Sequence, residues 1–449
     1  MSAKAMAETG SDAASVTVGE QRHSKAAQWV CIAIGLLLTL HAVRSYGYWH
    51  KGTHDHSVYW MAGERMAAGD ADLYDPPRDD ANMVGAFIYP PVFASVFAPL
   101  TFLPRQTGYA IWAVFQVVFI AAGALLLLRV PGARSWRVAL WTLLALLWPL
   151  MANISAGQIN TLIALLCIAG WLQLEKGHDL RAGALFALGA HIKVLPVVLL
   201  AMLVAQRRYK AAAAMVATGL LLMLMPLVWM APKHGLSGGL AATWRVDLSY
   251  AQRLRGVGSS AENQSGSGWN ADIDMWRKAE GNLALAGMAD RHLDPGLPRS
   301  AGMWAGAAVA LAMFISALAL ARRVQSASGR LGVVGLCMTA AALGNQLAWQ
   351  AHLVLLAMLV LPVLADSWGR TPRWYFAVLC SYMVMSELPP LLGFQLIFPA
   401  SVYDFTAHLQ SWGLPTAAVC GLWIASALYW MQRRNDNSTT ARLGLDAVR

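Results

Sequence analysis

Charged side chains are scarce in this chain. Asp, Glu, Lys and Arg together make up 13% of its 449 residues, whereas a typical soluble domain is about 25% charged. So few charges cannot cover the surface of a soluble protein of this size, so lipid must solvate much of the exterior. The hydrophobic content of 57% and the 19 Trp agree with this, because amphipathic aromatic residues collect at the bilayer interface. The composition predicts an integral membrane protein.

The patterns typical of disulfide-rich proteins and of zinc or other metal sites are also missing. The five cysteines lie in or beside apolar runs without CxxC spacing, and the chain has no HExxH or DxD cluster. We therefore expect no cofactor and no bound metal. The net charge of +10 comes from basic residues in short clusters between apolar runs, a pattern that reflects membrane topology and not a nucleic-acid partner.

About twelve apolar runs are candidates for membrane-spanning helices, each of which needs about 20 residues to cross the bilayer. The expected fold is therefore an all-α polytopic membrane protein. The runs lie near residues 27–43, 109–129, 137–151, 159–174, 181–191, 194–205, 211–230, 301–321, 331–350, 352–365, 374–394 and 411–431.

The distribution of Lys and Arg predicts the orientation. If the N-terminus is cytoplasmic, every inner link carries a basic residue, as the positive-inside rule requires. These links are RVPGARSWR, EKGHDLR, QRRYK, ARRVQSASGR, SWGRTPR and the tail that begins QRRN. We expect residues 1–26 to form a disordered cytoplasmic tail, residues 27–431 the transmembrane domain, and residues 432–449 a second cytoplasmic tail.

Two long segments, 46–106 and 231–300, then fall on the outer side with most of the other polar residues. The first contains GAFIYPPVFASVFAPLTFLPR, which is apolar but interrupted by four prolines. Proline breaks a continuous helix, so this stretch predicts a re-entrant or membrane-surface segment rather than a span.

Asp55 is the strongest candidate for chemistry in the first outer segment. It lies between His54 and His56 just beyond the first span, where a partly desolvated carboxylate can act as a general base toward a hydroxyl. The alternative is that it is one more loop carboxylate. A metal site on the two histidines is a weaker interpretation, because no second ligand cluster accompanies them.

Further polar residues lie at the outer ends of later spans. Lys193, in GAHIKVLP, either reaches solvent or binds a phosphate. Gln158 and Asn160, in SAGQINTL, either cap a helix or bind sugar hydroxyls. His352 lies at the mouth of a span, where an ionisable group is costly and indicates function, and Trp349 lies three residues before it on what we expect to be the same helical face.

Four stretches of the chain resemble the polyprenol-phosphate-mannose-dependent mannosyltransferases of glycosyltransferase family 87, which have the GT-C fold. They are DHSVYWMAG with LYDP; FIYPPVFASVFAPLTFLP; GQINTLIALL with AGALFALGAHIKVLPVVLL; and ENQS with WQAHLVLL. They occur in the family's order from about residue 55 to 355. Two departures are the histidines that flank Asp55 and the single histidine after Trp349.

The resemblance implies an inverting transfer of mannose or another hexose from a polyprenyl-phosphate donor to a lipid-linked or glycan acceptor. The reaction would occur on the periplasmic side of a bacterial inner membrane, without a metal. Carried over by position, Asp55 matches the general base, and Lys193 and His352 match residues that meet the donor phosphate. The predicted substrate-binding set is His54, Tyr59, Tyr89, Gln158, Asn160, Asn263, Gln264 and Trp349, of which the resemblance matches Tyr59, Tyr89, Asn263 and Gln264.

Two other classes of protein remain open from the sequence. A transporter or flippase of lipid-linked sugars also has many spans, but its ionisable groups would line the bilayer midplane. Here the span interiors are nearly free of charge, with Glu387 as the main exception. A non-enzymatic scaffold would not need so one-sided a set of polar residues.

Overall fold

The computed structural model describes the chain as a bundle of helices. It describes residues 29–30, 32–47, 55–74, 87–256, 282–293, 300–345, 347–366, 368, 371–387 and 412–446. Within these ranges the regular structure is entirely helical. The prediction of an all-α polytopic membrane protein is confirmed at this level.

The first half of the bundle begins with an apolar helix at Ile32–Gly47. The helices that follow are α2 (Asp55–Ala67), α3 (Pro91–Phe97), η1 (Ala98–Phe102), α4 (Arg105–Leu127), α5 (Trp136–Leu144), α6 (Leu147–Ala156), α7 (Asn160–Glu175), α8 (Asp179–Ile192), η2 (Leu195–Val198), α9 (Leu199–Ala205) and α10 (Tyr209–Leu222).

The second half runs from a long bent helix to the C-terminal one. It contains α11 (Leu227–Gly256), α13 (Leu285–His292), α14 (Ser300–Ala321), α15 (Ala327–Gly344), η3 (Gln350–Leu356), α16 (Ala357–Asp366), α17 (Arg373–Tyr382), η4 (Met383–Glu387) and α20 (Leu414–Asp446). The segment 231–300 is thus helical over most of its described residues, in α11 and α13.

Four helices of the described residues are long and apolar enough to cross a bilayer, or up to six if each of two bent pairs is one span. Within the described residues, each of the twelve runs expected from the sequence overlaps a helix or a pair of consecutive helices. Several of these helices are too short to cross alone, so the count of twelve stays a prediction.

The bend between α5 and α6 shows how proline shapes these spans. The two helices meet at 52°, and Pro149 lies in the first turn of α6. Proline has no N–H to donate to the carbonyl four residues earlier, which is that of Ala145. The Tyr382 hydroxyl donates to this carbonyl at 3.3 Å instead. A neighbouring helix thus satisfies the backbone group that the proline leaves without a partner.

The proline-interrupted stretch in the first outer segment forms two short helices, α3 and η1, that pack on α2. Pro91 begins α3, a position at which the missing N–H costs nothing. Gly63 of α2 lies so close that a Cβ there would be 2.9 Å from Thr101 and 3.1 Å from Phe97. The expected helix segment after the first span is therefore present, and it is held against the start of that outer segment.

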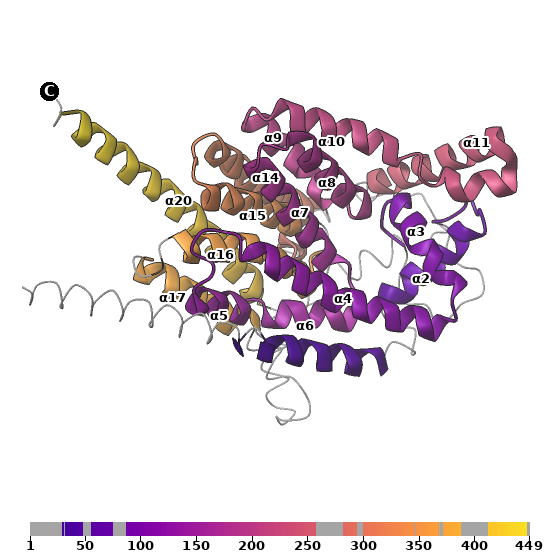
Figure 1. The fold of residues 1–449 in the computed structure, drawn as a ribbon, viewed down its shortest axis with the longest axis horizontal. Coiled ribbons are helices and arrows are strands. Elements are labelled where there is room, and N and C mark those ends of the chain that lie inside the picture. Colours follow the sequence, from indigo (N-terminus) through magenta and orange to yellow (C-terminus); the bar gives the residue numbers. More distant parts are fainter. Residues whose placement is uncertain are drawn as a thin grey trace, which may run out of the picture.

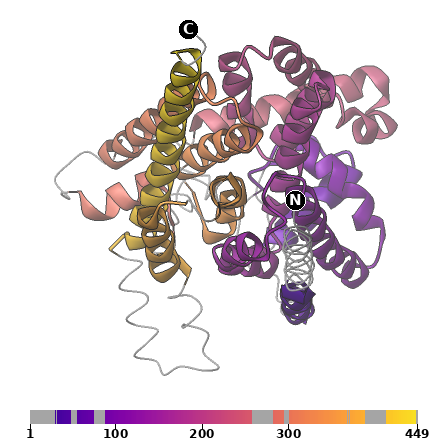
Figure 2. The same ribbon diagram turned by 60° about the vertical axis from the view of Figure 1, so that its left-hand side comes forward.

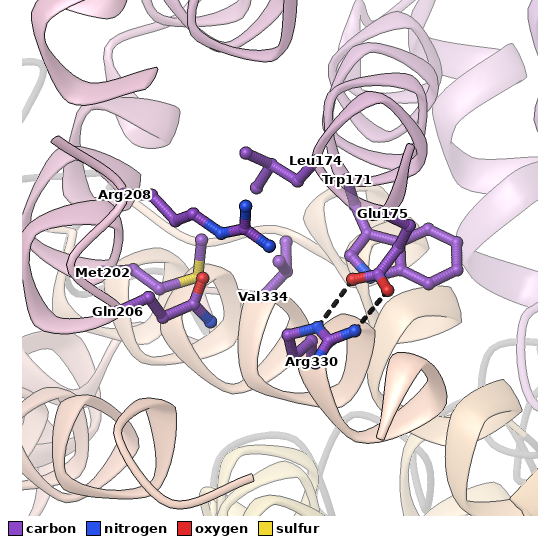
Figure 3. Close-up of a pocket in the computed structure, with 8 residues that line it drawn as sticks. All are labelled: Trp171, Leu174, Glu175, Met202, Gln206, Arg208, Arg330 and Val334. Carbon is purple, nitrogen blue, oxygen red and sulfur yellow. Dashed lines mark hydrogen bonds and ion pairs between the residues drawn. The ribbon is translucent and has the colours of Figure 1, made fainter. Parts of the chain in front are cut away.

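The basic links gather at one end of the bundle. Glu175, Arg208 and Arg330 come from three of these links or their flanking helices and line one small depression (Figure 3). The guanidinium of Arg330 pairs there with the Glu175 carboxylate. Near the other links, Arg433 pairs with Asp366 at 2.9 Å. This depression has no room for a water molecule, so it is a packing contact and carries no substrate.

The opposite end of the bundle contains α2, α3 and α11. Figure 1 shows α2, α3 and α11 together at the right, while α5, α17 and the C-terminal part of α20 lie at the left. In Figure 2, where the left-hand side comes forward, α20 stands in front and α11 lies behind.

Candidate active site

Asp55 is the first residue of α2, and its side chain is half-buried. Within the described part of the chain its carboxylate makes no hydrogen bond and no ion pair. Burial raises the pKa of this carboxyl to about 6, and the positive charge of Lys193 opposes part of the shift. A carboxylate with a raised pKa and unoccupied lone pairs is suited to accept a proton.

Two tyrosines and an amide form a buried hydrogen-bond chain beside Asp55. Tyr59 lies one helical turn after Asp55, and its hydroxyl donates to that of Tyr89 at 2.9 Å. Tyr89 in turn donates to the Gln158 side-chain oxygen at 3.1 Å. Burial raises the pKa of both phenols, and the nearby charge of Asp55 adds to this. Both tyrosines therefore stay neutral and keep their hydroxyl protons.

The turn between α6 and α7 brings Gln158 and Asn160 into this chain. Gly157 ends α6 in the left-handed conformation, with φ of 66°. A Cβ at this position would also lie 2.9 Å from the Cβ of His56. Glycine is therefore required twice, for its backbone conformation and for the close approach of α2. The turn after it directs the Gln158 oxygen toward Tyr89.

Lys193 is a buried cation without an anionic partner in the described residues. Helix α8 ends at Ile192, where Lys193 is extended and Pro196 follows three residues later. The lysine amine donates to the Asn160 side-chain oxygen at 2.7 Å and lies 5.4 Å from the centre of the Tyr89 ring. Burial lowers its pKa to about 7, and the charge of Asp55 opposes the shift. An ammonium has three donors, so this one can still bind an anion.

His352 completes the group of polar residues from a fifth segment of the chain. It is buried in η3, and its charge would interact with that of Lys193. Its Nδ1 accepts a hydrogen bond from the Trp349 backbone N–H at 3.1 Å. Trp349 itself is extended, with φ of −103° and ψ of 164°. The expectation that both residues share one helical face is therefore wrong, because η3 begins only after Trp349.

His56 lies within α2 and is fully buried. Its ring makes an edge contact with Tyr109 at a centroid distance of 4.4 Å. Among the described residues no group of three His, Cys, Asp or Glu side chains is arranged to hold a metal ion. Three predicted substrate-binding residues, His54, Asn263 and Gln264, lie outside the described residues.

A second layer of polar residues supports the α6–α7 turn, and the sequence did not single it out. Asn153 donates to the Gln158 backbone carbonyl at 3.0 Å and to the Gln116 side-chain oxygen at 2.8 Å. Thr161 donates to the same oxygen at 3.1 Å, and Trp112 donates to the Gly157 carbonyl at 2.9 Å. Isolated polar residues inside apolar runs were the available signal, since burial of such groups requires partners.

The chain was then compared with known proteins. The model of glycosyltransferase family 87 matches residues 87–344, more than half of the chain. The chain belongs to glycosyltransferase family 87. This confirms the resemblance found in the sequence motifs and favours an enzyme over a transporter or a scaffold. The match includes Tyr89, Gln158, Asn160 and Lys193, whereas Asp55 and His352 lie outside it.

One curated relative is a polyprenol-phosphate-mannose-dependent alpha-(1-2)-phosphatidylinositol pentamannoside mannosyltransferase of Mycolicibacterium smegmatis. It is 30% identical over 166 residues, which cover 34% of this chain and 38% of the relative. The similarity therefore spans less than half of the relative's length. No solved structure matches the chain significantly.

Proposed function

We propose that this family 87 protein transfers a sugar, mannose or another hexose, from a polyprenyl-phosphate donor to a hydroxyl of a lipid-linked or glycan acceptor. The observation that carries the proposal is the arrangement of Asp55 and Lys193. A carboxylate with no partner and a buried ammonium with no anionic partner, both within the described residues, interact electrostatically beside one polar network. The relative's name adds support for the class of donor.

The reaction needs one bond to form and one to break. Asp55 accepts the proton of the acceptor hydroxyl as its oxygen attacks the anomeric carbon of the donor sugar. The bond between that carbon and the phosphate oxygen breaks, and polyprenyl phosphate leaves with the bonding electrons. Attack opposite to the leaving group inverts the anomeric carbon. The phosphate is already a good leaving group, so the enzyme mainly positions and stabilises charge.

The remaining residues have supporting roles in this proposal. Lys193 binds the phosphate as a compact point charge, and His352, whose charge would interact with that of Lys193, contacts a further phosphate oxygen. The amides of Gln158 and Asn160 and the hydroxyls of Tyr59 and Tyr89 bind sugar hydroxyls. His54, Asn263, Gln264 and Trp349 complete the proposed substrate-binding set.

The proposal places the site on the periplasmic side of a bacterial inner membrane, in a GT-C fold of about twelve spans with both termini cytoplasmic. Its support is the separation of the polar network from the basic links, which gather at the other end of the bundle. The positive-inside rule assigns the basic end to the cytoplasm.

The substitution Asp55→Asn tests the proposed base. In proteoliposomes with a radiolabelled mannosyl-phosphoryl polyprenol donor and an extract of membrane glycolipids, we expect turnover to fall about 10²- to 10⁴-fold, the usual contribution of general base catalysis. The KM for the donor should change little, because Lys193 is retained. Asp72→Asn is the matched control, since Asp72 lies in the same outer segment and is half exposed.

The outcomes of this experiment separate the competing ideas. Full turnover by Asp55→Asn overturns the role of Asp55. A wild-type protein that moves the labelled lipid across the bilayer without releasing its sugar to any acceptor overturns the transferase and supports a flippase.

A further inference from the structure

The C-terminal half of α11 carries three polar side chains on the side that packs on the bundle. Thr243, Asp247 and Tyr250 are spaced four and three residues apart, so they lie on one side of the helix. Helix α11 packs on α2 and α3 (Figure 1). Thr243 is buried, whereas Trp244 and Arg245, which point elsewhere from the helix, are each 65% exposed. We call Thr243, Asp247 and Tyr250 the α11 face.

The α11 face has no hydrogen-bond partner and no ion pair within the described residues. The hydroxyls of Thr243 and Tyr250 are shielded from solvent. Asp247 is half-buried, and burial raises the pKa of its carboxyl to about 7. A buried polar group without a partner is costly, and native structures contain few of them. Three such groups side by side indicate that a polar ligand supplies the missing hydrogen bonds.

Two tyrosines join the α11 face to the proposed active site. The ring of Tyr250 stacks on that of Tyr74 at a centroid distance of 5.7 Å. Tyr74 in turn donates a hydrogen bond to the Tyr89 backbone carbonyl at 2.8 Å, and Tyr250 is close enough to Tyr89 to interact with it electrostatically. The Tyr89 ring also lies 5.4 Å from the Lys193 amine. The α11 face therefore adjoins the polar network that contains Lys193.

Side chains of these types suit a neutral sugar. A carboxylate accepts charge-assisted hydrogen bonds from hydroxyls, and a tyrosine offers an apolar ring with a hydroxyl at its rim. The charge of Asp247 disfavours a phosphate, because no cation of the described residues interacts with it. Asp55 differs in this respect, since the charge of Lys193 acts on it. The α11 face therefore fits a sugar unit that carries no phosphate.

We propose that the α11 face binds a sugar unit of the acceptor, an inference that rests on the proposed function. The donor's sugar is joined to its phosphate, so Lys193 determines where that sugar lies. An inverting attack brings the acceptor hydroxyl from the side of the sugar opposite to the phosphate, and so from a part of the site without a cation. Asp247 and Tyr250 hold acceptor hydroxyls that do not react, which orients the reacting hydroxyl toward Asp55.

The substitutions Asp247→Asn and Tyr250→Phe test the α11 face. Initial rates are measured in proteoliposomes with mannosyl-phosphoryl decaprenol as donor and an extract of membrane glycolipids as acceptor, each varied in turn. We expect the apparent KM for the extract to rise about tenfold or more in Asp247→Asn and about three- to tenfold in Tyr250→Phe, the usual ranges for a charged and a neutral hydrogen bond. The KM for the donor should change little, because Lys193 is retained.

Thermal unfolding in detergent separates ligand binding from a structural role. Asp247 and the Tyr250 hydroxyl have no partner within the described residues, so neither substitution should lower the unfolding temperature. Arg245→Gln is the matched control. It removes the ion pair between α11 and Asp72 but leaves the α11 face intact, so it should keep the wild-type KM for both substrates.

The possible results distinguish this inference from the proposed function. A raised KM for the donor with an unchanged KM for the extract would assign the α11 face to the donor's sugar and overturn the inference. Unchanged KM values for both substrates, or a lower unfolding temperature in either variant, would show that these groups bond within the protein, and would also overturn it. If the wild-type protein transfers no sugar to the extract, the proposed function itself fails and the inference fails with it.

Discussion

Burial shifts the pKa values of Asp55 and Lys193 in opposite directions. Burial penalises the charged form of each group, so it raises the pKa of the carboxyl to about 6 and lowers the pKa of the amine to about 7. The attraction between them counteracts both shifts. In the proposed reaction the carboxylate must be free to take a proton while the amine keeps one, and both conditions hold only between these values.

We therefore expect a bell-shaped dependence of kcat/KM on pH. Below about 6 Asp55 is protonated and cannot act as a base, so activity falls as pH falls. Above about 7 Lys193 loses its charge and binds phosphate weakly, so activity falls as pH rises. The two apparent pKa values of the profile belong to the interacting pair of Asp55 and Lys193 and not to either residue alone. Initial rates measured against pH in proteoliposomes check this, and a flat profile contradicts it.

A change of Lys193 separates the two limbs of this profile. Arginine stays protonated at any pH that the protein survives, so Lys193→Arg should keep the acid limb and lose the alkaline one. Retention of the alkaline limb in this variant would assign it to another group.

The sequence was sufficient to single out most of the polar residues that the structure brings together. Asp55, Lys193 and His352 stand out because ionisable groups beside apolar runs are costly. The supporting amides of Gln116 and Asn153 do not stand out, since nothing local shows that their side chains meet across two helices. Only their hydrogen bonds to each other and to the α6–α7 turn reveal that role.

At the scale of the elements, the α6–α7 turn connects the packing of α2 to the site. Gly157 is required both for its positive φ and for the approach of His56. Gly177, in the α7–α8 link, shares the conformation with φ of 75° but has no atom near an added Cβ. The two glycines therefore form a matched pair in which only one has a crowded environment.

Gly157→Ala should destabilise the protein more than Gly177→Ala. Each should cost about 1–2 kcal/mol for a left-handed alanine, and Gly157→Ala should cost about 1–3 kcal/mol more for the displaced His56. Thermal unfolding in detergent measures both. Gly157→Ala should also slow turnover, because it displaces Gln158. Equal unfolding temperatures for the two variants would show that α2 yields without strain.

The sequence predicts where the helices lie, but it does not predict where they break. Apolar runs predict where helices lie, because lipid or a packed core must surround them. The 52° bend at Ala145 depends on Pro149 and on a hydroxyl from Tyr382, 237 residues further along the chain. A single run in the sequence thus becomes two helices, and the sequence alone does not say where a partner for the freed carbonyl will be.

At the scale of the whole molecule, the separation of basic links from the polar network agrees with the alternation read from the sequence. The depression at Glu175, Arg208 and Arg330 and the ion pair of Arg433 with Asp366 join links that are far apart in the chain. The proposed site lies on the opposite ends of helices α7 and α8. This arrangement requires that consecutive helices cross the bundle in alternate directions.

Single cysteines introduced on a background without native cysteines test the proposed orientation. Ala68 and Lys176 are both exposed and lie at the ends of α2 and α7. We expect an impermeant maleimide to label Ala68→Cys in intact spheroplasts, and to label Lys176→Cys only after the membrane is opened. The reverse pattern would place the proposed site in the cytoplasm and contradict a periplasmic reaction.

The sequence by itself determined that the protein is helical and membrane-embedded and that it belongs with family 87. These properties follow from the composition and from the order of residues along the chain. In lipid each span must form its own backbone hydrogen bonds, and the positive-inside rule places Lys and Arg in the links on one side. The tertiary structure decided which residues meet: Tyr89 with Gln158, and Lys193 with Asn160. Such meetings depend on packing between helices distant in sequence, which no local pattern encodes.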